Sequence, residues 1–369
     1  MAYEKELELA LRAVHRASLA TKKVQQSTAD KGVSDKSDDT PVTIADFAAQ
    51  ALLIGAVHRA FPDDVFIAEE SSDILRASPD LRQRVWDLVL SVGPLNGLPV
   101  PSDQDEMLDL IDLGSNAAKD PRGAGRVWVL DPVDGTKTFM KGQQYAVCLC
   151  MLEKGAQKVA ALGCPNLLYD PDTPLVTEDI VDTDGDGIIV AAVAGQGTFF
   201  TPLHSFADTA ARRTAKLDTL PPYPGSLRFM DSEESSHVSK RHHEYLYRTA
   251  FPEASHYVGG TVGDSPWPED VWAMQMKYVA VALNAADATF RIPGDPKFYA
   301  SVWDHAGGQL ILEEAGGVVT DSAGNRFDFS KGQRSFADGN WGFVVARSGE
   351  VHQAVLKEVQ GLISSGLEK

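Results

Sequence analysis

Residues 126–136 read Arg126-Val-Trp-Val-Leu-Asp131-Pro-Val-Asp134-Gly-Thr136. The apolar residues before Asp131 predict a strand that ends in an aspartate, and Pro132 then turns the chain. A second aspartate follows three residues later, and Gly135 allows the backbone to enter a helix sharply at Thr136. The free amides at the start of that helix, those of Gly135 and Thr136, are expected to cradle a phosphate group.

The two aspartates, Asp131 and Asp134, repel each other unless a cation lies between their carboxylates. Because they offer only oxygen ligands, Mg²⁺ or Mn²⁺ fits better than zinc. A turn with two solvated aspartates is the alternative interpretation, since Asp-Pro and Asp-Gly are common turn pairs. Carboxylates in similar positions elsewhere in the chain would favour the metal site.

A second motif, Thr40-Pro-Val-Thr43-Ile-Ala-Asp46, stands at the start of a helix expected over residues 44–60. Thr43 suits the N-terminal cap, and Asp46 suits the positive end of the helix dipole. These structural roles would explain the motif if it stood alone.

Two further carboxylates lie at the ends of expected elements. Glu69 follows a short buried strand over residues 65–68, and its neighbour Glu70 must point the other way. Asp304 opens a helix expected over residues 304–315, whose small residues permit close packing. Either motif could be structural on its own.

In this order, the four motifs resemble those of the inositol monophosphatase superfamily of Mg²⁺-dependent, lithium-sensitive phosphatases. The superfamily pattern is Asp-Pro-x-Asp-Gly-Thr, followed far downstream by Trp-Asp-x-Ala-(Ala/Gly)-Gly. The resemblance covers nearly the whole chain except the 170–190 region, and it is strongest to the 3′(2′),5′-bisphosphate nucleotidases of fungi and plants. The stretches that carry this more specific similarity are residues 4–26, 37–43 with 46–50, 61–72, 125–137, and 144–149 with 163–167.

The resemblance implies an α/β fold, a layered α/β/α/β/α sandwich of the inositol monophosphatase type with two subdomains. Residues 1–165 would form an N-terminal α+β subdomain with most metal ligands, and residues 166–369 a C-terminal α/β subdomain with Asp304 and the substrate contacts. Helical and strand patterns that mix without strict alternation agree with a layered fold. The other expected helices lie over residues 4–26, 102–113 (with Gly114 just past its end) and 269–286. The other expected strands lie over 126–130, 145–152 and 159–163, and the last two pair as a hairpin around the Lys154-Gly155 turn. A second hairpin is expected over 188–200.

The resemblance also implies a role for each site residue. The groups expected to hold two or three Mg²⁺ ions are Glu69, Asp131, the Val133 carbonyl, Asp134 and Asp304. Asp46 and Thr136 would orient and deprotonate the attacking water, while the phosphoryl group would rest on the amides of Gly135 and Thr136.

For the nucleotide, the resemblance points to His237, Lys277 and Arg291. A surface position is the alternative for Lys277, because most lysines are exposed. Met274 stands where the related nucleotidases have a serine, so base recognition is expected to be loose. Of the neighbouring histidines His237, His242 and His243, all but His237 are expected on the surface.

Composition limits the possible partners and compartments. The 369 residues carry a formal net charge of −18, which argues against binding nucleic acid or anionic membranes. The three cysteines indicate free thiols in a reducing compartment. Cys148 and Cys150 lie in an apolar run, so we expect them to be small buried residues and not metal ligands. The charged N-terminus lacks the apolar core of a signal peptide. We therefore expect a cytoplasmic protein, with a monomer favoured.

The predicted function is a Mg²⁺-dependent phosphatase that converts adenosine 3′,5′-bisphosphate to AMP and phosphate, with 3′-phosphoadenylyl sulfate as a candidate second substrate. An inositol phosphate or polyphosphate phosphatase on the same scaffold is the first alternative. A catalytically inactive nucleotide-binding sensor is the second, but it would require a lost ligand or base, and every expected position is present.

Overall fold

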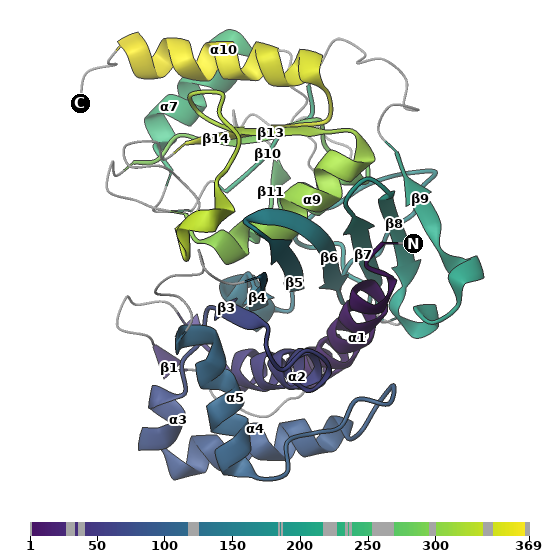
Figure 1. Ribbon diagram of the computed structural model, residues 1–369. Coiled ribbons are helices and arrows are strands. Elements are labelled where there is room, and N and C mark those ends of the chain that lie inside the picture. Colours follow the sequence, from purple (N-terminus) through teal and green to yellow (C-terminus); the bar gives the residue numbers. More distant parts are fainter. Residues whose placement is uncertain are drawn as a thin grey trace.

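The computed structural model has five layers, in the order helix, sheet, helix, sheet, helix (Figure 1). This arrangement confirms the expected α/β/α/β/α sandwich. The described residues are 2–26, 34–35, 41–116, 125–183, 185, 187–216, 227–232, 235, 238–252, 269–294, 300–334 and 342–365.

The larger sheet has seven strands in the order β3-β4-β5-β6-β7-β8-β9. β3 runs parallel to β4, and every other neighbouring pair is antiparallel. The strands are β3 (Val65–Ala68), β4 (Arg126–Asp134), β5 (Ala146–Glu153), β6 (Ala156–Cys164), β7 (Ile188–Val193), β8 (Gly197–Pro202) and β9 (Arg213–Ala215). The expected strand before Glu69 and both expected hairpins are therefore confirmed.

Side chains of the central strands alternate between two hydrophobic cores. On β5, Val147, Leu149 and Met151 belong to one core, while Cys148 and Cys150 belong to the other. Successive residues of a strand point to opposite faces, and here both faces are covered. This explains why the strands read as continuous apolar runs, and it confirms the two cysteines as small buried residues.

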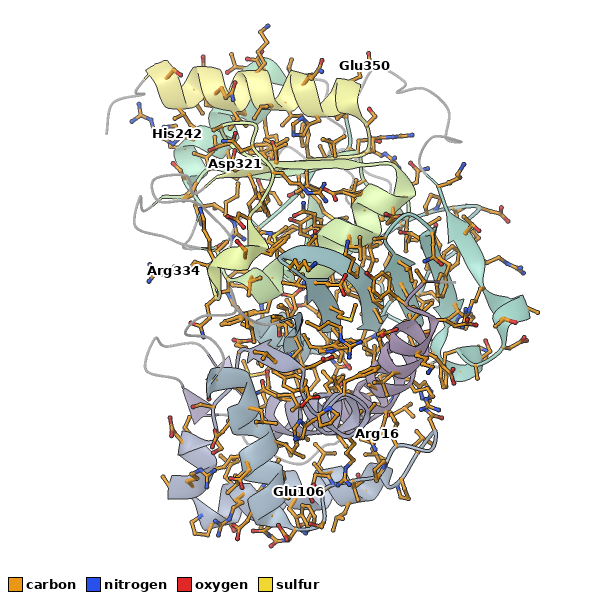
Figure 2. All side chains as sticks on the ribbon, viewed as in Figure 1. Arg16, Glu106, His242, Asp321, Arg334 and Glu350 are labelled. Carbon is orange, nitrogen blue, oxygen red and sulfur yellow. The ribbon has the colours of Figure 1, made fainter. Side chains whose placement is uncertain are left out.

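Helices α1 (Glu4–Gln26) and α2 (Ile44–Ala60) cover one face of the sheet, with the bounds that the sequence predicts. α3 (Asp73–Ala77) and α4 (Pro79–Val92) pack outside them, and α5 (Gln104–Asn116) packs against both α2 and β3 (Figure 1). Arg16 of α1 is fully buried in this layer and donates hydrogen bonds to backbone carbonyls, including that of Leu52 in α2 (Figure 2). Within the described ranges, no helix combines the length and the hydropathy that a membrane span requires.

The opposite face of the sheet packs against α8 (Met274–Ala282) and α9 (Ala306–Ala315), which form the central helical layer. Beyond them lies a three-stranded antiparallel sheet in the order β12-β14-β13. Its outer face is covered by α10 (Gly349–Ser365), beside α7 (Lys240–Tyr245). The three strands are β12 (Ala288–Arg291), β13 (Val318–Asp321) and β14 (Phe343–Ala346).

Several element boundaries differ from the prediction. β4 continues past Asp131 and Pro132 to Asp134, and the helix expected to open at Asp304 begins at Ala306. α5 continues through Gly114 to Asn116. A Cβ on Gly114 would lie 2.4 Å from the Cβ of Ala68. This glycine is required for packing against β3 and does not end the helix. The helix predicted over residues 269–286 is reduced to α8, since Glu269–Asp270 forms β11, a strand parallel to β10 (Met230–Asp231).

The predicted subdomain boundary after residue 165 falls between β6 and β7, which are hydrogen-bonded neighbours in the larger sheet. The division into residues 1–165 and 166–369 stays a prediction.

Candidate functional site

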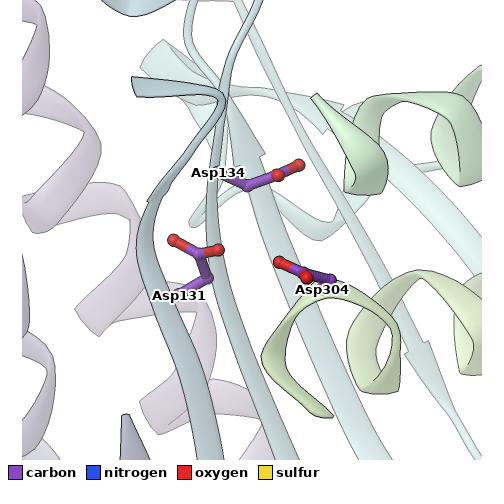
Figure 3. A group of neighbouring side chains, drawn as sticks. All are labelled: Asp131, Asp134 and Asp304. Carbon is purple, nitrogen blue, oxygen red and sulfur yellow. The ribbon is translucent and has the colours of Figure 1, made fainter. Parts of the chain in front are cut away.

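Three carboxylates converge at one end of β4. Asp131 and Asp134 come from β4 itself, and Asp304 comes from the 3₁₀ turn Val302–Asp304 that precedes α9 (Figure 3). Ligand atoms of the three residues lie within 4.8 Å of one another. The structure thus brings together two motifs that are far apart in the sequence.

A bulge in β4 makes this convergence possible. Residues three apart on a regular strand point to opposite faces. Asp131 pairs with Cys148 and Asp134 with Ala146, so β4 contains one extra residue between them. A bulge of this kind changes the direction in which a side chain points. Pro132 is tolerated there because a proline has no N–H to donate to the neighbouring strand. Both aspartates therefore reach the same site.

Without a bound cation, the mutual repulsion of these three carboxylates is unfavourable. Burial, together with the charges of Glu69, Asp134 and Asp304, raises the pKa of Asp131 well above its ordinary value. Burial and neighbouring carboxylates likewise raise the pKa of Asp304 to about 8. Carboxylates in this arrangement are relieved by a cation among them, and a set of oxygen donors fits a hard divalent ion. The donor set thus has the chemistry that the sequence predicts.

Glu69 lies beside this cluster because of the parallel pairing of β3 with β4. Ala68 pairs with Leu130, so Glu69 follows next to Asp131, with which it shares a hydrogen bond. Gln50 of α2 holds the adjacent backbone: its side chain accepts from the Glu70 amide at 3.0 Å and donates to the Glu70 carbonyl at 2.7 Å. The sequence analysis missed Gln50, although a glutamine within the apolar run of a buried helix is a signal for such a contact.

Asp46 connects α2 to the residues after β4. One carboxylate oxygen accepts from the Thr43 amide at 2.9 Å and from the Thr43 hydroxyl at 2.7 Å, which forms a capping box. The other oxygen is 3.3 Å from the Thr136 hydroxyl, which also lies 3.1 Å from the Val133 carbonyl. The structural role of this motif is therefore confirmed, and its catalytic role stays a prediction.

Gly135 adopts a left-handed backbone with φ 92° before α6 (Thr136–Lys141). A Cβ on this residue would lie 2.8 Å from the Cβ of Ala273 and 2.9 Å from the Thr138 hydroxyl oxygen. Only glycine fits this position, and the predicted helix start at Thr136 is confirmed.

Lys277 is buried, so its surface alternative is wrong. Its ammonium group donates to the Ser232 hydroxyl at 2.5 Å, and burial, followed by the charge of Arg291, lowers its pKa to about 8. Arg291, at the end of β12, places Nη2 4.0 Å from the Met274 sulfur. Burial lowers the pKa of Arg291, and the charge of Asp304 opposes this shift, as expected for a cation near the acidic cluster. His237 lies outside the described residues.

The expected surface position of His243 is also wrong. Its ring is fully buried, with Nδ1 2.6 Å from an Asp231 carboxylate oxygen and Nε2 accepting from the Ile292 amide at 2.9 Å. The same Asp231 oxygen accepts from the Tyr247 hydroxyl at 2.6 Å. The sequence does not predict the burial of His243, because it depends on contacts with Asp231 and Ile292, which are far away in the chain.

A comparison with known families finds a match to the inositol monophosphatase family over residues 3–364. Among curated proteins, a 3′(2′),5′-bisphosphate nucleotidase of Emericella nidulans is 37% identical, with 98% of this chain and 99% of that protein covered. A protein of the same name from Schizosaccharomyces pombe is 36% identical over 90% of this chain and 89% of its own length. A 3′,5′-bisphosphate nucleotidase of Arabidopsis thaliana is 31% identical, with 96% of both chains covered.

Solved structures show the same fold at low identity. An inositol monophosphatase of Thermotoga maritima is 15% identical, with a TM-score of 0.57 over 98% of this chain and 99% of its own. The extragenic suppressor protein suhB of Bartonella henselae is also 15% identical, with a TM-score of 0.59 over 99% of this chain and all of its own. These similarities concern the fold alone.

Proposed function

Since the chain belongs to the inositol monophosphatase family, we propose that it is a 3′(2′),5′-bisphosphate nucleotidase that converts adenosine 3′,5′-bisphosphate to AMP and phosphate. The observation that carries the proposal is the convergence of Asp131, Asp134 and Asp304 in a chain whose full-length relatives bear this name. The 3′-phosphoadenylyl sulfate remains a candidate second substrate.

The family is metal-dependent, and we propose Mg²⁺ as the ion, with two or three ions in each site. The proposed ligands are Glu69, Asp131, the Val133 carbonyl, Asp134 and Asp304. Bound there, the ions would supply Lewis-acid charge for in-line displacement at phosphorus and make an attacking water more acidic. They would also attract an anionic substrate to a protein whose formal net charge is −18.

Thr136 and Asp46 are the proposed groups for moving the proton. The Thr136 hydroxyl has two acceptors within reach, the Val133 carbonyl and Asp46, which is 3.3 Å away. If the Val133 carbonyl served as a metal ligand, the hydroxyl would donate its proton to Asp46. The hydroxyl oxygen then accepts the proton of the attacking water, and Asp46 takes up the threonine proton. Thr43 holds Asp46 by two hydrogen bonds, which keeps its second oxygen directed at Thr136.

Substrate binding is assigned to His237, Lys277, Arg291 and the amides of Gly135 and Thr136. Lys277, which is buried, and Arg291, which is half-buried, bring two cations close to the acidic cluster. A bisphosphate offers a second anionic group for such cations, and charge-assisted contacts are strong. A nucleotide therefore suits these residues better than inositol monophosphate does.

The compartment and the assembly belong to the same proposal. We propose a cytoplasmic monomer. The net charge of −18 supports the absence of nucleic-acid and anionic-membrane partners, and the three free, buried cysteines support a reducing compartment.

Phosphate release by the purified protein tests the function. With Mg²⁺ present, kcat/KM for adenosine 3′,5′-bisphosphate should greatly exceed that for inositol 1-phosphate, and chelation by EDTA should abolish both activities. Arg291→Ala should raise KM for the nucleotide with little change in kcat, whereas Arg248→Ala, at an exposed position, should behave as wild type. Equal efficiency on both substrates would overturn the nucleotidase, and full activity after chelation would overturn the mechanism.

A further inference from the structure

Helix α8 lies between the parts of the chain that supply Asp134 and Asp304. The amide of Met274 donates to one carboxylate oxygen of Asp134 at 3.1 Å, and the amide of Gln275 donates to the other at 2.6 Å. These amides belong to the first turn of α8, where no partner within the helix is available. Both oxygens of Asp134 are thus oriented by the start of one helix.

The side chain of Gln275 reaches from the same place to the segment that carries Asp304. Its Nε2 donates to the Trp303 carbonyl at 2.5 Å, and its Oε1 accepts from the Gly308 amide at 2.7 Å. These contacts stand on both sides of Asp304 in the chain. Gln275 itself is fully buried, so water does not replace these contacts.

The glycines after Asp304 allow this approach. A Cβ on Gly308 would lie 2.6 Å from Oε1 of Gln275 and 2.6 Å from the Tyr278 side chain. Tyr278, one turn further along α8, places its hydroxyl 2.8 Å from Nδ1 of His305. Because the glycines after Asp304 are small, α8 can pack closely enough for its side chains to hold the backbone around Asp304.

We propose that Gln275 is a positioning residue that sets the distance between the Asp134 and Asp304 carboxylates. It is joined to Asp134 through its backbone and to both flanks of Asp304 through its side chain. Carboxylates that repel one another separate unless the scaffold holds them, and groups that orient metal ligands affect affinity without touching the ion. The inference rests on the metal-dependent function proposed above.

Gln275→Met tests this role, because it keeps the length of the side chain and the backbone amide while removing both side-chain hydrogen bonds. The dissociation constant for Mg²⁺, measured by calorimetry on the whole protein, should rise by about 10- to 100-fold. Activity should need correspondingly more Mg²⁺, while kcat at saturating Mg²⁺ should stay near the wild-type value.

Gln309→Met is the matched control. Gln309 is also fully buried and lies on α9, but its side chain donates to Glu313. Both variants should lower the melting temperature of the metal-free protein, and only Gln275→Met should weaken Mg²⁺ binding. Should Gln275→Met not fold, Gln275→Asn, which is one methylene too short to make both contacts, should weaken binding in the same sense.

The outcomes separate this inference from the proposed function. If wild type binds Mg²⁺ and the Gln275 variants bind it equally tightly, or if Gln309→Met loses affinity to the same extent, the positioning role is wrong and the function stands. If wild type itself binds no divalent ion, the metal-dependent function fails first.

Discussion

Individual residues in this site serve the fold and the chemistry together. Asp46 caps α2 through Thr43 and accepts from Thr136 with its other oxygen. Substituting Asp46 would therefore remove one half of a capping box as well as a proposed catalytic group. Thr136 is the cleaner probe of the proton path, since its hydroxyl is not part of a capping box.

Thr136→Ala should lower kcat by about 10²- to 10⁴-fold, because it removes the hydroxyl that we propose passes the proton to Asp46. Mg²⁺ affinity and the melting temperature should change little. Thr136→Ser, which keeps a hydroxyl at the same position, should restore most of the activity. Steady-state kinetics and calorimetry on both variants check this, and a Thr136→Ala enzyme with normal kcat would place water activation elsewhere.

Because of Lys277, kcat/KM of the nucleotidase reaction should depend on pH in the alkaline range. Its pKa is lowered to about 8, so the ammonium group is charged below that pH and becomes neutral as the pH rises through it. If Lys277 binds the second phosphate, kcat/KM for adenosine 3′,5′-bisphosphate should fall as the pH increases from about 7 to 9.

The comparison substrate for this experiment is inositol 1-phosphate, which lacks the second phosphate and should show a weaker fall over the same pH range. Lys277→Met should have a lower kcat/KM for the nucleotide and a nearly flat profile. An unchanged alkaline fall in Lys277→Met would exclude Lys277 as its source.

At the scale of elements, the packing of α5 against β3 supports the position of Glu69. Gly114 faces Ala68, the residue before Glu69, and also lies near Gln50, whose side chain holds the Glu70 backbone. A larger residue at position 114 would push on the strand end that supplies a proposed ligand.

Gly114→Ala should therefore destabilise the protein by about 1–3 kcal/mol, since the added methyl group would overpack the contact with Ala68. Gly361→Ala is the matched control, because Gly361 lies in α10 with open space around its Cβ position. There the exchange should stabilise the helix by up to about 1 kcal/mol. Urea unfolding of both variants measures the difference, and equal effects would contradict the packing argument.

At the scale of the whole molecule, the buried acidic cluster opposes folding when no cation is bound. The pKa of Asp304, about 8, exceeds its ordinary value of 3.8, so the folded chelated protein holds this proton more tightly than the unfolded chain does. The free energy of unfolding of the chelated protein should accordingly fall as the pH rises toward about 8. Stability is lost in this direction because the carboxylate must become charged where it is buried beside others.

Asp304→Asn should raise the melting temperature of the chelated protein at pH 8 and reduce its loss of stability between pH 6 and pH 8. Wild type should gain about 2.7 kcal/mol from Mg²⁺ when the ion is present at about a hundred times its dissociation constant, and this variant should gain less. Thermal unfolding in EDTA, in Mg²⁺ and in NaCl of equal ionic strength separates specific binding from screening. The same response to both salts in wild type would contradict a metal site at this cluster.

The sequence by itself determined the elements whose signals are local. Helices α1 and α2, strand β3, the two hairpins and the start of α6 lie where periodicity and turn residues predict them. The chemical identity of the site also came from the sequence, because the order of the carboxylate motifs already resembled one superfamily. Local patterns suffice here, since an amphipathic helix or a Gly-containing turn is specified by neighbouring residues.

Tertiary structure alone decided how these parts meet. The bulge that turns Asp131 and Asp134 to one side, the burial of Lys277 and His243, and the contacts of Gln275 all depend on segments far away in the chain. Gly114 looked like a helix end because its partner, Ala68, is invisible to any local pattern. Periodicity specifies which face of an element is apolar, but only the packed layers specify what lies opposite that face.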